Sequence, residues 1–258
     1  MSLQNKVILI TGSTTGIGEA TARLCVEQGA QVMIHGRRAD AAQALVEELG
    51  ANSACVVGDL ADPALCQRIV AETVAHFGAL HGLVNNAALT TRSTLENTDA
   101  AIFDRIVGVN LRAPLLVIRA AAPIFRQQGG GAVVNIGSVN ALGGQPDLLA
   151  YSAAKGGLAT MTRNLANALA TELIRVNQLN VGWVTTPNEI ALKQTEGLAP
   201  GWENNVPKIF APTGRLLTPQ QVARHIAFWL SDVSAPANGV VYELEQYSHI
   251  GRNPYKEF

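Results

Sequence analysis

Tyr151 and Lys155 lie four positions apart in a segment of helical period. At this spacing both side chains project from one face of a helix, so the phenol and the ammonium can meet above one site. A free phenol has a pKa near ~10 and is a poor base at neutral pH, but a neighbouring positive charge favours phenolate. Ser138 follows a strand-like run thirteen residues before Tyr151, and its hydroxyl can hydrogen-bond a reacting oxygen. These three side chains predict proton transfer to or from an oxygen atom.

A glycine-rich turn directly follows the first strand-like run. Gly12, Gly16 and Gly18 form a Gly-x-x-x-Gly-x-Gly pattern that opens a helical segment. Such glycines let the backbone approach a pyrophosphate, whose charge is met by the N–H groups and positive dipole end of the helix. The turn lacks the Gly-Lys-Ser/Thr of a nucleotide-hydrolysing loop. It predicts dinucleotide binding, and the alternative is an ordinary glycine-rich turn.

The elements that must position these residues alternate along the chain. Short β-branched runs, the strand candidates, lie at residues 7–10, 31–35, 54–57, 82–84, 132–136, 175–179 and 240–243. Helical segments lie at residues 16–28, 39–49, 63–77, 99–127, 151–171 and 219–230. This alternation predicts an α/β fold: a Rossmann-like, doubly wound, seven-stranded parallel sheet with helices on both faces. We expect a single domain over residues 1–258, with a substrate lid at about 187–218 and a C-terminal tail at about 244–258.

Composition excludes several classes of function. Only 15% of the residues are charged and the formal net charge is −1, without a basic block, so nucleic acid is not the expected partner. No stretch offers the ~20 apolar residues of a membrane span, and no signal-peptide pattern opens the chain. Cys25, Cys55 and Cys66 lack CxxC spacing, and this pattern indicates a reducing compartment. We therefore expect a cytoplasmic protein. We expect no metal site, since the five histidines show no paired ligand spacing.

Further motifs follow in order along the chain, and together they resemble the classical short-chain dehydrogenase/reductase family. The motifs are Thr11-Gly12-Ser13-Thr14-Thr15-Gly16-Ile17-Gly18, Asp59-Leu60, Asn85-Asn86-Ala87-Ala88, Asn110, Ser138, Tyr151, Lys155, Gly182 and Thr186. The resemblance covers residues 5 to about 243. It implies an oxidoreductase that transfers a hydride between a nicotinamide cofactor and a secondary alcohol or carbonyl substrate. The catalytic residues that it implies are Asn110, Ser138, Tyr151 and Lys155, with Tyr151 as the acid/base.

The resemblance also implies a set of cofactor-binding residues. Together with Arg37 and Arg38 at the end of the second strand, the expected cofactor-binding residues are Gly12, Ser13, Thr14, Gly16, Ile17, Gly18, Arg37, Arg38, Asp59, Leu60, Asn86, Ala87, Ala88, Tyr151, Lys155, Gly182, Val184 and Thr186. In the family, the residue at Asp59 hydrogen-bonds the adenine amino group and that at Leu60 packs beside the ring. Residues 86–88 line the middle of the cofactor, and Ala88 stands where the family usually has Gly.

Three further roles come from the same resemblance. Thr186 is expected to hold the nicotinamide carboxamide, and Lys155 the hydroxyls of the nicotinamide ribose. Asn110 is expected to hold a water that relays protons between Lys155 and solvent. Val181 replaces the proline that commonly precedes Gly182 in the family. Classical members are commonly homotetramers, so a homo-oligomer is expected.

The end of the second strand predicts which nicotinamide cofactor is preferred. An acidic residue there would accept hydrogen bonds from the adenosine ribose 2′-OH and repel a 2′-phosphate. The strand ends instead in His35-Gly36-Arg37-Arg38. Arg37 is placed to make charge-assisted bonds to a 2′-phosphate, with Arg38 as a second cation. This favours NADP(H) over NAD(H), and the alternative is two solvated arginines, one of them neutralised by Asp40.

The substrate is expected to be a small polar molecule. The substrate-binding residues expected are Ser138, Asn140, Gln145, Tyr151 and Trp183. Asn140 and Gln145, with Asn188 and Glu189 in the lid, carry polar groups that can bind hydroxyls, so a sugar, polyol or sugar acid is the leading candidate. The alternative is an acyl-chain or steroid ketone, which would require more aromatic and aliphatic residues.

A second class of function stays open at this point. The same architecture could serve a non-catalytic nucleotide-sensing protein, since fold does not dictate function. A dehydratase or epimerase is a weaker option, because the site matches simple hydride transfer. The C-terminal tail extends beyond the usual family end, and we expect it to reach a neighbouring subunit or its active site.

Overall fold

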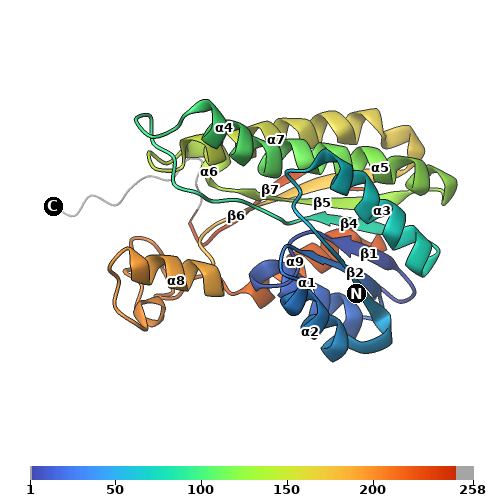
Figure 1. Ribbon diagram of the computed structural model, residues 1–258, viewed down its shortest axis with the longest axis horizontal. Coiled ribbons are helices and arrows are strands. Elements are labelled where there is room, and N and C mark those ends of the chain that lie inside the picture. Colours follow the sequence, from blue (N-terminus) through green and yellow to red (C-terminus); the bar gives the residue numbers. More distant parts are fainter. Residues whose placement is uncertain (1, 248–258) are drawn as a thin grey trace.

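The computed structural model describes residues 2–247, and these residues contain one seven-stranded sheet (Figure 1). The strands are β1 (Val7–Ile10), β2 (Gln31–Gly36), β3 (Ser53–Val57), β4 (Gly82–Asn85), β5 (Gly131–Ser138), β6 (Ile174–Val181) and β7 (Val241–Leu244). Their order in the sheet is β3-β2-β1-β4-β5-β6-β7, and every neighbouring pair is parallel. The predicted doubly wound fold is confirmed.

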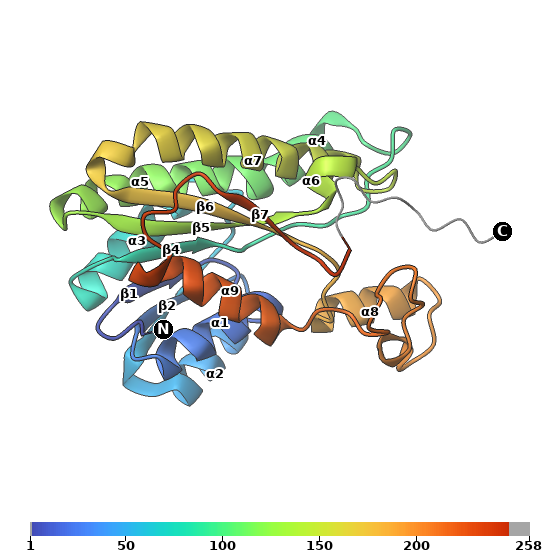
Figure 2. The same cartoon turned by 180° about the vertical axis from the view of Figure 1, so that it is seen from behind.

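Helices cover both faces of the sheet (Figures 1 and 2). They are α1 (Gly16–Glu27), α2 (Ala39–Leu49), α3 (Pro63–Phe77), α4 (Ala100–Val107), α5 (Ala113–Gln127), α6 (Asn140–Gly143), α7 (Leu149–Ala168), α8 (Pro187–Thr195) and α9 (Pro219–Leu230). Short 3₁₀ turns lie at Gly50–Asn52, Ala170–Glu172, Trp202–Asn204 and Asp232–Ser234. Ile8 and Ile10 pack in the core under α1, α2 and α9, whereas Leu9 packs in the opposite core under α3, α5 and α7. A strand buried on both faces is therefore apolar at every position.

The strand order reverses beside β1, and this reversal locates the site. β1 pairs with β2 on one side and with β4 on the other. Ligands of open α/β sheets bind in the crevice outside the carboxyl ends of the strands at such a point. The glycine turn follows β1, and Asn86 and Gly182 follow the ends of β4 and β6.

The helix predicted over residues 99–127 is interrupted at its middle. A π-helix over Gly108–Arg112 separates α4 from α5. Asn110 lies in it, and its side-chain Nδ2 donates a 2.9 Å hydrogen bond to the backbone oxygen of Ile106. Such π-turns within helices are frequent at functional sites. The period of the apolar residues did not reveal this interruption, because a π-turn shifts it by only one residue.

The lid expected at residues 187–218 has structure of its own. It contains α8 and a small apolar cluster of Val206, Ala211 and Leu216, against which Trp183 and Trp202 pack. The two indole rings stack at a centroid distance of 5.2 Å. Figures 1 and 2 show this orange segment as a lobe beside the carboxyl end of the sheet.

Three expectations concern what the chain lacks or where it ends. Within residues 2–247 no helix is both long and apolar enough to cross a membrane. Over the same residues, no group of three or more His, Cys, Asp or Glu side chains is arranged to hold a metal ion. Of the tail expected at residues 244–258, only 244–247 belong to the described part of the chain, so its expected contact with a neighbouring subunit lies largely outside it.

Candidate active site

A cleft of about 380 Å³ opens where the glycine turn and the ends of β4, β5 and β6 meet. The predicted site residues that line it are Gly12, Thr14, Gly16, Ile17, Arg37, Asp59, Leu60, Asn86, Ala87, Ala88, Ser138, Tyr151, Lys155, Gly182, Trp183, Val184 and Thr186. Those that do not line it are Ser13, Gly18, Arg38, Asn110, Asn140 and Gln145. The glycine turn and the predicted proton-transfer residues thus open into one space.

The glycine turn leaves room for a ligand because its glycines carry no side chains. Gly12 and Gly16 adopt φ values of +64° and +60°, which residues with a Cβ rarely adopt. A Cβ on Gly18 would lie 2.3 Å from the Gly12 carbonyl oxygen, and one on Gly12 would lie 2.8 Å from the Cα of Ala87. α1 begins at Gly16, so its free N–H groups face the turn. These features fit a dinucleotide pyrophosphate.

Side chains that follow β1 and β4 hold this turn in place. Thr11 Oγ1 accepts hydrogen bonds from the backbone nitrogens of Asn86 (3.0 Å) and Ala87 (3.1 Å). Asn86 Nδ2 donates to the backbone oxygens of Thr11 and Gly12, both at 2.9 Å. Asn86 therefore lines the cleft and at the same time ties the β4 end to the glycine turn.

Ser13 faces the protein interior and His35 holds the turn from behind. Ser13 Oγ donates to the Ile10 oxygen at 2.7 Å and accepts from the His35 nitrogen at 2.9 Å. His35 Nδ1 accepts from the Gly12 nitrogen at 3.1 Å, and Nε2 lies 3.2 Å from the Gly58 oxygen, so Nε2 carries the proton. Burial lowers the pKa of His35 to about 4. A histidine in an otherwise apolar strand was the sequence signal for this contact.

One end of the cleft carries an ion pair that the sequence did not predict. Asp59 Oδ1 accepts from the Ala61 nitrogen at 2.9 Å, and Oδ2 lies 2.5 Å from Arg105 Nη2. The Arg105 hydrogen bond lowers the pKa of Asp59 below its usual value. Arg37 lines the same end, and within residues 2–247 its side chain makes no hydrogen bond or ion pair. Arg38 occupies the N-cap position of α2 without a capping hydrogen bond from its side chain, and it does not line the cleft.

Ser138, Tyr151 and Lys155 gather at the other end of the cleft. Lys155 Nζ lies 5.5 Å from the centroid of the Tyr151 ring and donates a 2.6 Å hydrogen bond to the Ile136 oxygen. Burial raises the pKa of Tyr151 to about 12, although a hydrogen bond with Ser138 opposes the shift. The charge of Glu189 adds to the increase. Burial lowers the pKa of Lys155 to about 8.

The ammonium of Lys155, together with the positive nicotinamide ring of the oxidised cofactor, was expected to move the pKa of Tyr151 toward neutrality. In the protein alone, desolvation is the largest influence on both groups, and it raises the pKa of the phenol and lowers that of the ammonium. Further positive charge beside the phenol is therefore needed to make phenolate at ordinary pH.

Asn110 lies behind the cleft wall rather than in it. Its side chain is fully buried, and Nδ2 donates to the oxygens of Leu89 and Ile106 at 2.9 Å each. Its Oδ1 accepts from the Leu89 nitrogen at 3.3 Å. Both amide hydrogens are thus used by the protein, so the side chain has no donor left for the expected relay water.

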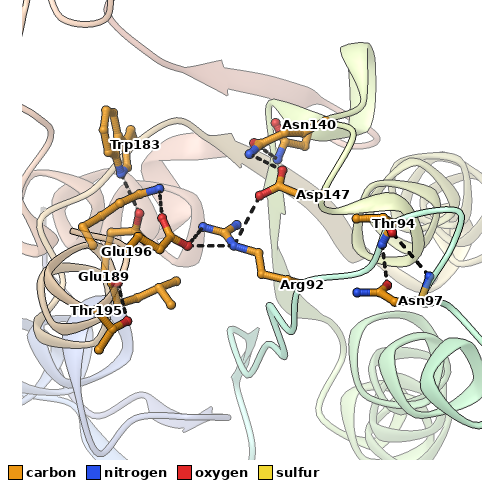
Figure 3. Close-up of polar contacts among 12 residues, drawn as sticks. Arg92, Thr94, Asn97, Asn140, Asp147, Trp183, Glu189, Thr195 and Glu196 are labelled. Carbon is orange, nitrogen blue, oxygen red and sulfur yellow. Dashed lines mark hydrogen bonds and ion pairs between the residues drawn. The ribbon is translucent and has the colours of Figure 1, made fainter. Parts of the chain in front are cut away.

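The polar residues expected to bind substrate divide into two groups. Trp183 lines the cleft, as do residues 188–189 of α8. Asn140 and Gln145 do not, because Asn140 Nδ2 donates to Gln145 Oε1 (3.3 Å) and Gln145 Nε2 donates to Asp147 Oδ1 (2.7 Å). Their polar groups are used between α6 and the loop before α7, and Figure 3 shows Asn140 and Asp147 on the opposite side of Arg92 from Glu189 and Glu196.

Glu245, just beyond β7, supports the wall that follows β6. Its Oε2 accepts from the backbone nitrogen of Trp183 at 3.1 Å. A Cβ on Gly182 would meet this carboxylate, so a larger residue there would displace the Glu245 side chain. Gln246 continues the contact to the lid, because its Oε1 accepts from Thr213 Oγ1 at 2.7 Å. Glu245 and Gln246, the described part of the tail, therefore contact the cleft wall and the lid of their own chain.

This arrangement defines a class of protein, a nucleotide-dependent enzyme on a doubly wound α/β fold, and known proteins match it. A family model described as Enoyl-(Acyl carrier protein) reductase matches residues 12–244. The cyclohexanol dehydrogenase of Acinetobacter sp. (strain SE19) is 33% identical over 93% of this chain and 94% of its own.

Two solved structures are similar over nearly the whole length. The crystal structure of 3-ketoacyl-(acyl-carrier-protein) reductase from Brucella melitensis, complexed with NADH, is 33% identical and has a TM-score of 0.83, covering 94% of this chain and 98% of that one. The crystal structure of levodione reductase is 29% identical and has a TM-score of 0.88, and the match covers 96% of this chain and 99% of that one. The chain belongs to the short-chain dehydrogenase/reductase family and is a nicotinamide-dependent oxidoreductase that acts on CH–OH groups.

Proposed function

We propose that this enzyme interconverts a secondary alcohol and its ketone on a small, polar, hydroxylated substrate, with NADP(H) preferred over NAD(H). The observation that carries the proposal is that Ser138, Tyr151 and Lys155 line the same cleft as the glycine turn. A proton-transfer group and a dinucleotide cradle that share one space are what hydride transfer to a carbonyl requires.

The chain offers a place for each part of the dinucleotide. The turn at residues 12–18 and the start of α1 hold the pyrophosphate, while Asp59 and Leu60 hold the adenine. Residues 86–88 line the middle, and residues 182–186 hold the nicotinamide. All these segments contribute to the lining of the cleft. When bound, the nicotinamide supplies or accepts a hydride at its ring C4 and, in its oxidised form, adds a positive charge.

Tyr151 moves the proton. In carbonyl reduction its phenol O–H bond breaks and the proton goes to the substrate oxygen as that oxygen becomes an alkoxide. In alcohol oxidation the phenolate takes the hydroxyl proton. The Ser138 hydroxyl donates a hydrogen bond to the same oxygen, where negative charge develops. Lys155 keeps a buried positive charge beside the phenol and is held by the Ile136 carbonyl.

Arg37 supports the cofactor preference. Its guanidinium lines the cleft, and no hydrogen bond or ion pair within residues 2–247 occupies it. A free guanidinium can bind a 2′-phosphate through charge-assisted, bidentate hydrogen bonds. No carboxylate stands at the end of β2, where one would repel that phosphate.

Assembly and location form part of the same proposal. We infer a single-domain, cytoplasmic homotetramer. The support is a charged fraction of 15%, below the ~25% of typical soluble chains, which is consistent with subunit contacts. Light scattering of the purified protein tests the assembly, and a monomer contradicts it.

The experiment that tests the function is Tyr151→Phe. We expect turnover of alcohols and ketones to fall by about 10²–10⁴-fold, because a positioned acid/base contributes that much. Cofactor affinity, measured by fluorescence quenching, should stay within about twofold since the phenyl ring remains.

Tyr242→Phe is the matched control. Tyr242 lies outside the cleft lining, and its ring stacks on His225 at 5.7 Å. It should keep full turnover. If Tyr151→Phe also kept full turnover, Tyr151 would not be the acid/base and the proposed mechanism would be wrong. A protein that binds the cofactor but turns over no alcohol or ketone, with or without the substitution, would be a sensing protein.

A further inference from the structure

Glu189 places a carboxylate in the substrate part of the cleft. Its backbone nitrogen donates to Thr186 Oγ1 at 3.2 Å, in the first turn of α8. Trp183 Nε1 donates a 2.8 Å hydrogen bond to Glu189 Oε1 (Figure 3). The N-terminal end of a helix stabilises a negative charge, and Glu189 lies in the first turn of α8.

The second carboxylate oxygen of Glu189 can still accept hydrogen bonds. Within residues 2–247, Glu189 Oε2 accepts no hydrogen bond. Glu189 lines the cleft together with Ser138 and Tyr151, and its charge raises the pKa of Tyr151. The carboxylate is therefore close enough to the reacting position to influence the charge there.

The cations beside Glu189 already have partners. Arg92 pairs with Glu196 at 2.6 Å and with Asp147 at 3.3 Å. Lys193 pairs with Glu196 at 2.6 Å, and its Nζ lies 5.7 Å from the Trp183 ring. Figure 3 shows Arg92 between Glu196 of the lid and Asp147 of the loop before α7. The charge of Glu189 also acts on Arg92, so three carboxylates, those of Asp147, Glu189 and Glu196, surround these two cations.

We propose that Glu189 is a specificity-determining residue that makes the enzyme select neutral hydroxylated substrates and reject substrates that bring a carboxylate into the cleft. This inference rests on the proposed function and narrows its substrate class: sugars and polyols remain, whereas sugar acids and keto acids are excluded. A neutral hydroxyl can donate to the unused carboxylate oxygen. A substrate carboxylate would instead meet a like charge in a partly dehydrated cleft.

A matched pair of ring alcohols tests the selection. The neutral probe is cis-4-(hydroxymethyl)cyclohexanol, and the anionic probe is cis-4-hydroxycyclohexanecarboxylate, which has the same ring and similar size. For the holoenzyme we expect kcat/KM to favour the neutral probe by about 10- to 100-fold, because two like charges in one cleft repel each other strongly at an effective dielectric near ~20. If a probe is not oxidised, its competitive inhibition constant against the best substrate gives the same ratio.

Glu189→Gln removes the charge with little change of shape. The glutamine oxygen can still accept from Trp183 Nε1, so the α8 start is kept. We expect the preference for the neutral probe to fall below about threefold, because the like-charge repulsion is gone. Glu189→Asp keeps the charge and should retain most of the discrimination. Glu72→Gln, on the surface of α3, removes a carboxylate that pairs with Arg68 and should leave the ratio unchanged.

A second readout does not depend on the probes. Lys155 of α7, Ser138 of β5 and Glu189 of α8 face the phenol of Tyr151. Removing the carboxylate charge favours phenolate, so the pH profile of alcohol oxidation by Glu189→Gln should move to lower pH with any active substrate. A folded Glu189→Gln enzyme with an unchanged probe ratio and an unchanged profile overturns this inference. If that result accompanies an inactive Tyr151→Phe, the proposed function stands without it; an active Tyr151→Phe defeats the proposed function itself.

Discussion

Arg105 Nη2 lies 2.5 Å from Oδ2 of Asp59, at the end of the cleft proposed to hold adenine. The two side chains come from α4 and from the segment after β3. Both are partly exposed, with 39% and 41% of their side-chain surfaces accessible. The pair keeps Asp59 ionised and oriented, and this makes Arg105 a positioning residue.

Arg105→Gln is predicted to weaken cofactor binding by about two- to fivefold, because an exposed ion pair is worth about 0.2–1 kcal/mol. Fluorescence titration with the preferred cofactor measures the effect, and kcat at saturating cofactor should be unchanged. Arg126→Gln, which breaks an ion pair with Glu172 outside the cleft lining, is the control. An unaltered dissociation constant in Arg105→Gln would show that Asp59 needs no partner.

Arg37→Ala is predicted to weaken NADPH binding by about 10- to 100-fold, since hydrogen bonds to charged groups contribute about 1.5–3 kcal/mol. Binding of NADH should change by less than about threefold, because its ribose carries no phosphate for the guanidinium to bind. Arg38→Ala should affect neither, since Arg38 does not line the cleft. Equal affinities for NADPH and NADH in the unaltered protein would defeat the argument for NADP(H).

His35 is predicted to make the fold sensitive to acid. Burial lowers its pKa in the folded protein to about 4, from the ordinary value of 6.5. Between these values the unfolded chain binds more protons, so stability falls as pH drops from 6.5 toward 4. This one group should remove about 2 kcal/mol from the free energy of unfolding between pH 7 and pH 5.

His35→Gln tests that prediction by urea denaturation at the two pH values. Glutamine offers an acceptor for the Gly12 nitrogen and a donor for the Gly58 oxygen, but it does not titrate. The variant should lose less stability than the unaltered protein when the pH falls from 7 to 5. Identical pH dependence in both proteins would mean that His35 does not carry the effect.

Lys155→Met is predicted to raise stability while abolishing turnover. The pKa of buried Lys155 is lowered to about 8 in the folded protein from 10.5, so below pH 8 its charge destabilises the fold. Removing it should add about 1–3 kcal/mol to the free energy of unfolding at pH 7, offset in part by the lost bond to Ile136. The gain should shrink as pH rises from 8 to 10.5, where the unaltered lysine becomes neutral in the unfolded chain as well. Urea unfolding at pH 7 checks it, and a less stable variant contradicts it.

The sequence alone determined the features that depend on neighbours along the chain. The four-residue spacing of Tyr151 and Lys155 places them on one helix face, and α7 confirms it. The glycines at 12, 16 and 18 mark a turn that no other residue type fits, and the alternation of apolar runs predicted the parallel sheet. Each of these follows from local geometry and from the period of the backbone.

The tertiary structure decided which way the other side chains face and what they touch. Ser13 lies within the glycine motif yet bonds inward to Ile10, and Asn140 of α6 bonds to Gln145 of the following loop instead of lining the cleft. Arg105 reaches Asp59 across 46 residues of sequence. Burial, rather than spacing, sets the directions of the Tyr151 and Lys155 pKa shifts. Contacts and desolvation of this kind arise only when distant segments pack together, so no spacing along the chain contains them.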